Sequence, residues 1–143
     1  MNYRMVAFVL GRIFAIEAVL MLFPLICAML YGEWYLLPAF LLPAVLLAVL
    51  GLAASLRTPK NTTIFARDGL AIVALVWVLM SAFGALPFVI SGEIPSFIDA
   101  FFETVSGFTT TGSTILTDVE ALSHGTLFWR SFAHWVGGMG VLV

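Results

Sequence analysis

Long apolar runs separated by short polar segments form the pattern of this chain. The runs cover approximately residues 13–31, 35–56 and 69–90, and a fourth begins near Leu127 and continues to Val143. A helix that crosses a bilayer needs about 20 predominantly apolar residues, and the first three runs meet that length. We therefore predict an all-α integral membrane chain: an amino-terminal transmembrane helix hairpin over residues 1–63, followed by one helix, pore loop, helix repeat over residues 64–143.

Composition supports a membrane location and excludes other classes. Hydrophobic residues make up 62% of the chain, charged residues only 10%, and the mean hydropathy is +1.12. The net charge of −2 gives no basic surface for nucleic acid. Cys27 is the only cysteine, and His124 and His134 lack paired metal-ligand spacing. We expect no enzyme activity and no cofactor.

Basic residues predict the orientation. Five of the six cations fall at one side of the predicted zigzag of helices: Arg4, Arg12, Arg57, Lys60 and Arg67. By the positive-inside rule that side is cytoplasmic and includes the amino terminus. The sixth cation, Arg130, is near the outer end of the fourth run, where we expect its long side chain to snorkel to the interface.

The 36 residues between the third and fourth runs, 91–126, are too apolar for a plain external loop and too interrupted for a span. Ser96 is a candidate N-cap with Asp99 three residues later, and a pore helix is predicted over residues 96–107. Its residues 97–107, which follow the cap, span about 16 Å, or half of a hydrocarbon core of about 30 Å. We expect it to enter the membrane from outside and to end near the centre.

The segment that follows, residues 109–114, has a polar sequence that cannot pack as a core: Thr109, Thr110, Thr111, Gly112, Ser113 and Thr114. Irregular backbone is tolerated at membrane depth only where it is buried in protein or lines a water-filled path. Carbonyl rings can replace the hydration shell of a potassium ion, and the carboxyl end of the pore helix favours a cation. Gly112 permits a positive φ. We predict a selectivity filter whose ion-binding carbonyls belong to Thr110, Thr111, Gly112 and Ser113, flanked by Thr109 and Thr114.

Other residues carry weaker expectations. Glu103 either supports the filter, by bonding its backbone or pairing with Arg130, or is an acid near an outer vestibule. We expect His134 to pack against the pore loop, Glu17 to face another helix and Trp129 to lie at the interface. Close helix packing is expected at a group of glycines: Gly137, Gly138 and Gly140.

Two segments resemble a known family. They read FFETVSGFTTTGST at residues 101–114, and FWR at 128–130 followed by HWVGGMGV at 134–141. The chain is similar to the Trk/Ktr/HKT superfamily, and within it to the Trk-type potassium-uptake membrane subunits (TrkH-like). The resemblance implies four pore-loop repeats in one polypeptide around a single pore, preceded by an extra hairpin. Because related plant transporters with serine in place of this glycine prefer sodium, Gly112 implies potassium.

The resemblance also implies an assembly in the bacterial inner membrane. Expected partners are membrane lipid, the remaining repeats of the same polypeptide and a peripheral nucleotide-binding regulatory subunit (TrkA-like), and we expect a homodimer. The chain ends inside its fourth apolar run, so we expect a longer gene product. Three alternatives stay open: a small homotetrameric cation channel, a membrane scaffold that does not transport, and an intramembrane hydrolase using Glu103 and the histidines.

Overall fold

The computed structural model describes residues 2–56, 58–59, 63 and 65–142, with the backbone alone described for residues 141 and 142. Its helices are α1 (Tyr3–Leu20), α2 (Leu22–Leu30), the short 3₁₀ helix η1 (Trp34–Leu36), α3 (Leu37–Ser55), α4 (Ala66–Ser91), α5 (Phe97–Phe108) and α6 (His124–Leu142). No strand occurs in these ranges, so the predicted all-α fold is confirmed. Arg57 and Lys60, which entered the orientation argument, lie outside the described residues.

Within the described residues, three helical segments are long and apolar enough to cross a membrane: Tyr3–Leu30, Trp34–Ser55 and Ala66–Ser91. The first of them begins ten residues earlier than the predicted span. Arg4 and Arg12 were expected to flank this span, whereas both belong to α1. Near its middle this span is interrupted at Met21, three residues before Pro24, whose missing N–H cannot bond the carbonyl of residue 20. Helix α6 is not among the three, because it includes Arg130, two histidines and four glycines.

The hairpin is held together by close backbone approach. A Cβ atom on Gly11 would lie 2.9 Å from the carbonyl oxygen of Gly51, and a Cβ on Gly51 would lie 2.7 Å from that of Gly11. Only residues without a side chain allow α1 and α3 to pack this tightly, which is the usual device of membrane helix pairs. The core between hairpin and repeat includes the buried rings of Phe40, Phe88 and Trp129.

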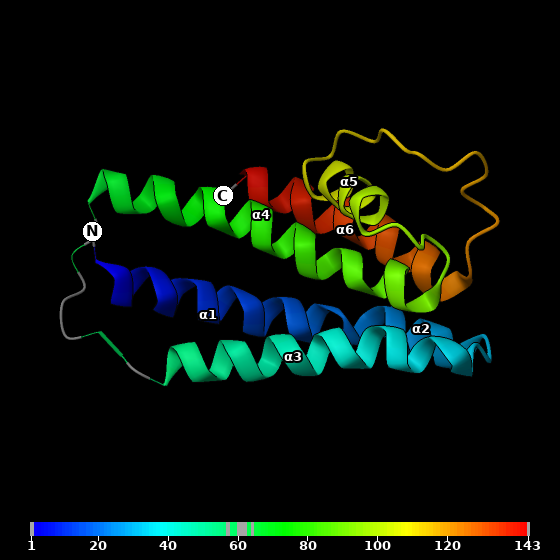
Figure 1. The fold of residues 1–143 in the computed structure, drawn as a ribbon, viewed down its shortest axis with the longest axis horizontal. Coiled ribbons are helices and arrows are strands. Elements are labelled where there is room, and N and C mark those ends of the chain that lie inside the picture. The colour runs from blue at the N-terminus through cyan, green and yellow to red at the C-terminus, as the bar shows by residue number, and fades with distance from the viewer. Residues whose placement is uncertain (1, 57, 60–62, 64, 143) are drawn as a thin grey trace.

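Helix α5 differs in direction from the long helices. In Figure 1 it is seen nearly end-on beside α4 and α6, whereas the long helices run across the view, so α5 is steeply inclined to them. Its penetration along the bundle is therefore shorter than the 16 Å or so expected for a helix parallel to the others. The connection after α5 runs back along the bundle to the end where α6 begins.

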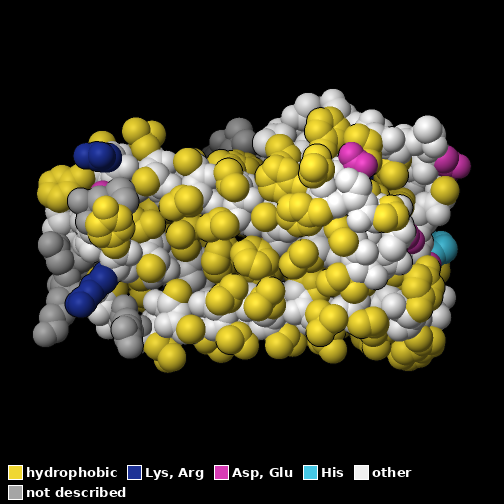
Figure 2. Space-filling model, in the orientation of Figure 1, with side chains coloured by type: hydrophobic (Ala, Val, Ile, Leu, Met, Phe, Trp, Pro, Cys, Tyr) yellow, Lys and Arg dark blue, Asp and Glu magenta, His cyan; other side chains and the backbone are white. Residues whose placement is uncertain are grey.

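The two ends of the bundle differ in charge. On the face drawn in Figure 2, Lys and Arg side chains gather at the end that holds the amino terminus, and acidic side chains and a histidine gather toward the opposite end. Apolar side chains cover the length between them. This surface suits a bilayer, with polar groups at its two faces.

Candidate pore loop and its supporting contacts

Local sequence fixes both ends of α5. At its start, the Ser96 hydroxyl accepts a hydrogen bond from the backbone N–H of Asp99 at 3.4 Å, which confirms the predicted N-cap. At its end, the Thr111 N–H donates to the Ser106 carbonyl at 2.9 Å and the Thr110 N–H donates to the Gly107 carbonyl at 3.0 Å. These two bonds form a Schellman motif, which normally places glycine at the left-handed position.

In this chain the left-handed position is Thr110, with φ of 58°. A β-branched residue with positive φ is an outlier that costs about 1–3 kcal/mol and is usually found at functional sites. In this motif the N–H groups of Thr110 and Thr111 donate hydrogen bonds to carbonyl oxygens of the last helical turn. The Ser106 and Gly107 carbonyls are therefore already bonded within the chain, and the predicted attraction of this helix end for a cation stays a prediction.

The loop itself leaves several backbone oxygens open. Residues 111–114 have no regular structure and are exposed, and Gly112 has φ of 77°, the positive value expected for it. Among the described residues, nothing donates a hydrogen bond to the carbonyl oxygens of Thr110, Thr111 or Gly112. The Ser113 carbonyl differs, because it accepts a bond from the Ser106 hydroxyl at 2.5 Å and so faces α5. Sequence reasoning missed this role of Ser106.

Glu103 connects the far side of the loop to α6. Its side chain is 1% exposed, and one carboxylate oxygen lies 2.5 Å from the Nε atom of Arg130. The other oxygen accepts bonds from the Thr114 hydroxyl at 3.0 Å and from the Ile115 N–H at 3.2 Å. Arg130 therefore turns inward to Glu103, and the expectation that it snorkels to the interface was wrong. Leaving the buried Glu103 carboxylate without a partner would be strongly destabilising, and the Arg130 guanidinium supplies that partner.

Helix α6 packs directly on the end of α5. A Cβ atom on Gly137 would overlap the carbonyl oxygen of Phe108 and lie 2.6 Å from its carbonyl carbon, whereas a Cβ on Gly140 would meet nothing within 4 Å. His134 bonds the Arg130 carbonyl at 2.8 Å and lies beside Gly107, so it packs against the end of α5, close to its expected position. His124 is ten residues away, about 15 Å along the helix, so the two histidines do not form one site.

Trp129 was expected at the membrane interface, but it is buried with only 1% of its surface exposed. Its indole N–H donates to the Gly84 carbonyl at 2.9 Å, and its ring meets Phe108 edge-on at 6.3 Å between centroids. An indole whose N–H is bonded inside the protein gains nothing from an interface. Glu17 behaves as expected: it is fully buried and faces α4, with an oxygen 3.5 Å from a Cβ built on Gly84.

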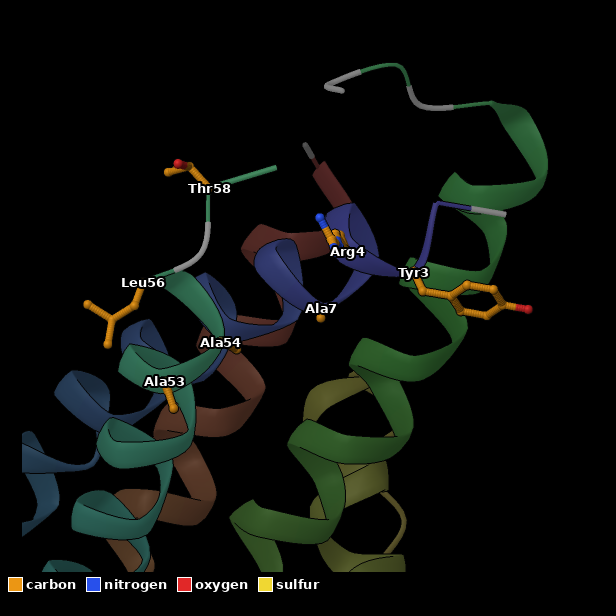
Figure 3. Close-up of a pocket in the computed structure, with 7 residues that line it drawn as sticks. All are labelled: Tyr3, Arg4, Ala7, Ala53, Ala54, Leu56 and Thr58. Atoms are coloured by element: carbon orange, nitrogen blue, oxygen red, sulfur yellow. The ribbon is translucent and has the colours of Figure 1, made fainter. Parts of the chain in front are cut away.

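A separate cleft of about 680 Å³ lies at the opposite end of the bundle, between the start of α1 and the end of α3. Figure 3 shows Tyr3 and Arg4 on the first turn of α1, with the aromatic ring and the basic side chain pointing in different directions, and Leu56 and Thr58 after α3. The cleft shares no residue with the pore loop, and we assign it no role in the site.

Comparisons with known proteins agree with this architecture. The family model for TrkH, described as a cation transport protein, matches residues 38–143. The chain is 38% identical to an uncharacterized cation transporter of Methanocaldococcus jannaschii, over 94% of the chain and 28% of the relative. It is 35% identical to the Trk system potassium uptake protein TrkG of Escherichia coli, over 99% of the chain and 30% of the relative.

A solved structure extends the agreement to three dimensions. The crystal structure of the potassium transporter TrkH from Vibrio parahaemolyticus superimposes with a TM-score of 0.91 at 34% identity, covering 99% of this chain and 31% of that one. The chain thus spans about 30% of the length of the relatives it matches.

Proposed function

Because the chain belongs to the TrkH family of cation transport proteins, we propose that it serves potassium uptake across the bacterial inner membrane and supplies one of four pore loops of a selectivity filter. The observation that carries this proposal is a short exposed loop with three unpaired carbonyl oxygens, at Thr110, Thr111 and Gly112, braced from behind by α5 and α6. Since the chain spans about 30% of its relatives, transport by the whole protein is part of the proposal.

The loop geometry suits a cation that has lost its water shell. In ordinary extended backbone, successive carbonyls point to opposite sides. Left-handed residues at Thr110 and Gly112 interrupt that alternation, so neighbouring oxygens can turn toward one axis. We assign ion coordination first to the carbonyls of Thr110, Thr111 and Gly112. Ser113 is the weakest of the four predicted ligands, because its oxygen is already bonded to the Ser106 hydroxyl.

In this proposal Glu103 and Arg130 hold the filter and do not bind the ion. The pair is close to neutral overall, and the carboxylate oxygen not facing Arg130 fixes both the Thr114 hydroxyl and the Ile115 N–H. Fixing the outer end of the loop prevents its carbonyls from collapsing or spreading when an ion enters or leaves. Preorganised dipoles of this kind favour an ion without reorganising around it.

The rest of the assembly is inferred from the family. We propose that the amino terminus is cytoplasmic, that residues 109–114 line the pore at membrane depth, and that the other three loops come from the same polypeptide. A TrkA-like regulatory subunit, a homodimer and bound lipid are further parts of this proposal. The long transporter relatives favour it over a homotetramer of this chain, a scaffold or a hydrolase.

The test compares two glycine substitutions in a bacterial strain that lacks potassium uptake. The wild-type gene product should restore growth at low potassium, and Gly112→Ser should lower the ratio of potassium to sodium uptake. Gly92→Ser is the matched control. Gly92 also has a positive φ, 79°, and a Cβ atom built on it would meet nothing within 4 Å, but it lies at the end of α4 and not in the loop. Failure of the wild type to restore growth would refute potassium uptake. An equal ion ratio in Gly112→Ser and wild type would refute the filter assignment.

A further inference from the structure

Two carboxylates from different elements converge on the amino-terminal end of α6. Glu33, in the turn between α2 and η1, accepts bonds from the N–H groups of His124 and Gly125, both at 2.9 Å. Glu93, after α4, accepts from the Ser123 N–H at 2.9 Å and from the Thr126 hydroxyl. The first N–H groups of a helix lack partners within it, and carboxylates stabilise that end.

Glu33 also contacts the side chain of His124, the first residue of α6. Its Oε1 atom lies 3.0 Å from Nδ1 of His124, and the imidazole stacks on Tyr31 with 4.0 Å between centroids and a 4° angle between planes. Behind this contact a Cβ on Gly125 would lie 3.0 Å from the side chains of Ala28 and Leu36. The end of the hairpin is thus seated on the first turn of α6 by hydrogen bonds, ring stacking and close packing.

A continuous set of contacts connects the first turn of α6 to the pore loop. Gly125 and Arg130 are five residues apart on one helix, which is about 7.5 Å of axial rise. Arg130 bonds Glu103, and Glu103 bonds Thr114 and Ile115. Because a helix moves as a rigid element over such a length, a shift or rotation of the first turn of α6 would change the distance between Arg130 and Glu103.

We propose that Glu33 is a positioning residue for ion selection: it fixes the start of α6 and thereby the Arg130 to Glu103 contact that holds the outer end of the loop. The inference rests on the proposed function, because it concerns the selectivity of the same filter. It gives a role in transport to the amino-terminal hairpin, which contributes no residue to the loop. Glu33 does not touch the loop and acts only through α6.

The test is Glu33→Gln in the gene product, with ion uptake measured as the ratio of potassium to sodium alongside the amount of protein in the membrane. We expect the ratio to fall by on the order of threefold to tenfold, which lies within the roughly twofold to thirtyfold effects known for mutations in packed networks that connect two sites. Glu120→Gln is the matched control: Glu120 is an exposed acid in the same connection before α6, and its side chain makes no hydrogen bond in the described structure. A merely structural role would lower abundance and total uptake without changing the ratio.

A double mutant tests whether Glu33 acts through Glu103, and comparison with Gly112→Ser separates the positioning role of Glu33 from the filter assignment. If Glu33 acts through Glu103, combining Glu33→Gln with Glu103→Gln should change the ratio little beyond Glu103→Gln alone. Should Glu33→Gln fail to reach the membrane, Glu33→Asp replaces it and should also lower the ratio, because its shorter side chain cannot reach the same N–H groups. If Gly112→Ser alters the ratio while the Glu33 variant does not, the positioning role is refuted and the filter assignment stands. If Gly112→Ser has no effect, the proposed function itself has failed.

Discussion

The contact between Gly137 and Phe108 gives the sharpest structural prediction, the effect of Gly137→Ala. The new methyl carbon would overlap the Phe108 carbonyl oxygen and lie 2.6 Å from the carbonyl carbon, whereas ordinary contact begins at 3.4 Å, so α6 and α5 must separate locally by more than the 0.8 Å or so that the carbonyl carbon alone requires. The obstructing atoms are backbone and cannot rotate away. Overpacking normally costs about 1–3 kcal/mol, and this site should reach the upper end of that range.

The assay is thermal unfolding of the purified protein in detergent, with Gly140→Ala as control on the same helix. For Gly137→Ala we expect the midpoint to fall by about 10 °C, from about 3 kcal/mol in a domain of this size. Gly140→Ala meets no atom within 4 Å and should be neutral or slightly stabilising, because alanine is favoured over glycine in helices by about 1 kcal/mol. Equal midpoints for the two variants would refute the close approach of α6 to α5.

Two further predictions concern Thr110 and Glu33. Thr110→Gly should raise the unfolding midpoint by a few degrees, because glycine adopts φ of 58° without the penalty of about 1–3 kcal/mol that the threonine side chain causes. A lowered midpoint would contradict the strain at this residue. Burial acts to raise the pKa of Glu33, but hydrogen bonds from Gly125 and His124 outweigh it and leave the pKa below its ordinary range. A carboxylate whose pKa is lower in the folded than in the unfolded protein contributes its full stabilisation at pH values above the unfolded pKa. That contribution is lost as the pH falls through the folded-state pKa. The difference in unfolding midpoint between wild type and Glu33→Gln should therefore shrink in acid, and a difference independent of pH would contradict it.

The sequence predicted those features that depend on local pattern. Apolar runs identified the helices of the hairpin and α4, and the Ser96 cap identified the start of α5 within one residue. The positive φ of Gly112 followed from its residue type. Each of these follows from hydrophobic length, capping or backbone freedom, which act over a few neighbouring residues.

Features that depend on how helices face one another could not be predicted in the same way. Arg130 and Trp129 are adjacent, and both were expected at the interface, yet both are turned inward by partners 27 and 45 residues away. The three glycines near the end of α6 have equivalent sequence signals, but only Gly137 touches backbone. The Glu33 cap joins residues 91 and 92 positions apart. Such pairings are set by tertiary packing, and the hydrophobic periodicity of a single sequence does not indicate which distant residues will meet.

Strain in the loop explains why so many contacts converge behind it. Thr110 occupies a left-handed conformation that an unrestrained chain would leave, so other interactions must offset its cost. The Schellman bonds hold its inner end, the Ser106 hydroxyl holds Ser113, and Glu103 holds Thr114. A loop held at both ends is restrained from rearranging, and among the described residues its carbonyls at Thr110, Thr111 and Gly112 accept no hydrogen bond. In the proposed filter, loosening either end should therefore reduce ion selection before it unfolds the protein, because these carbonyls lose their fixed positions first.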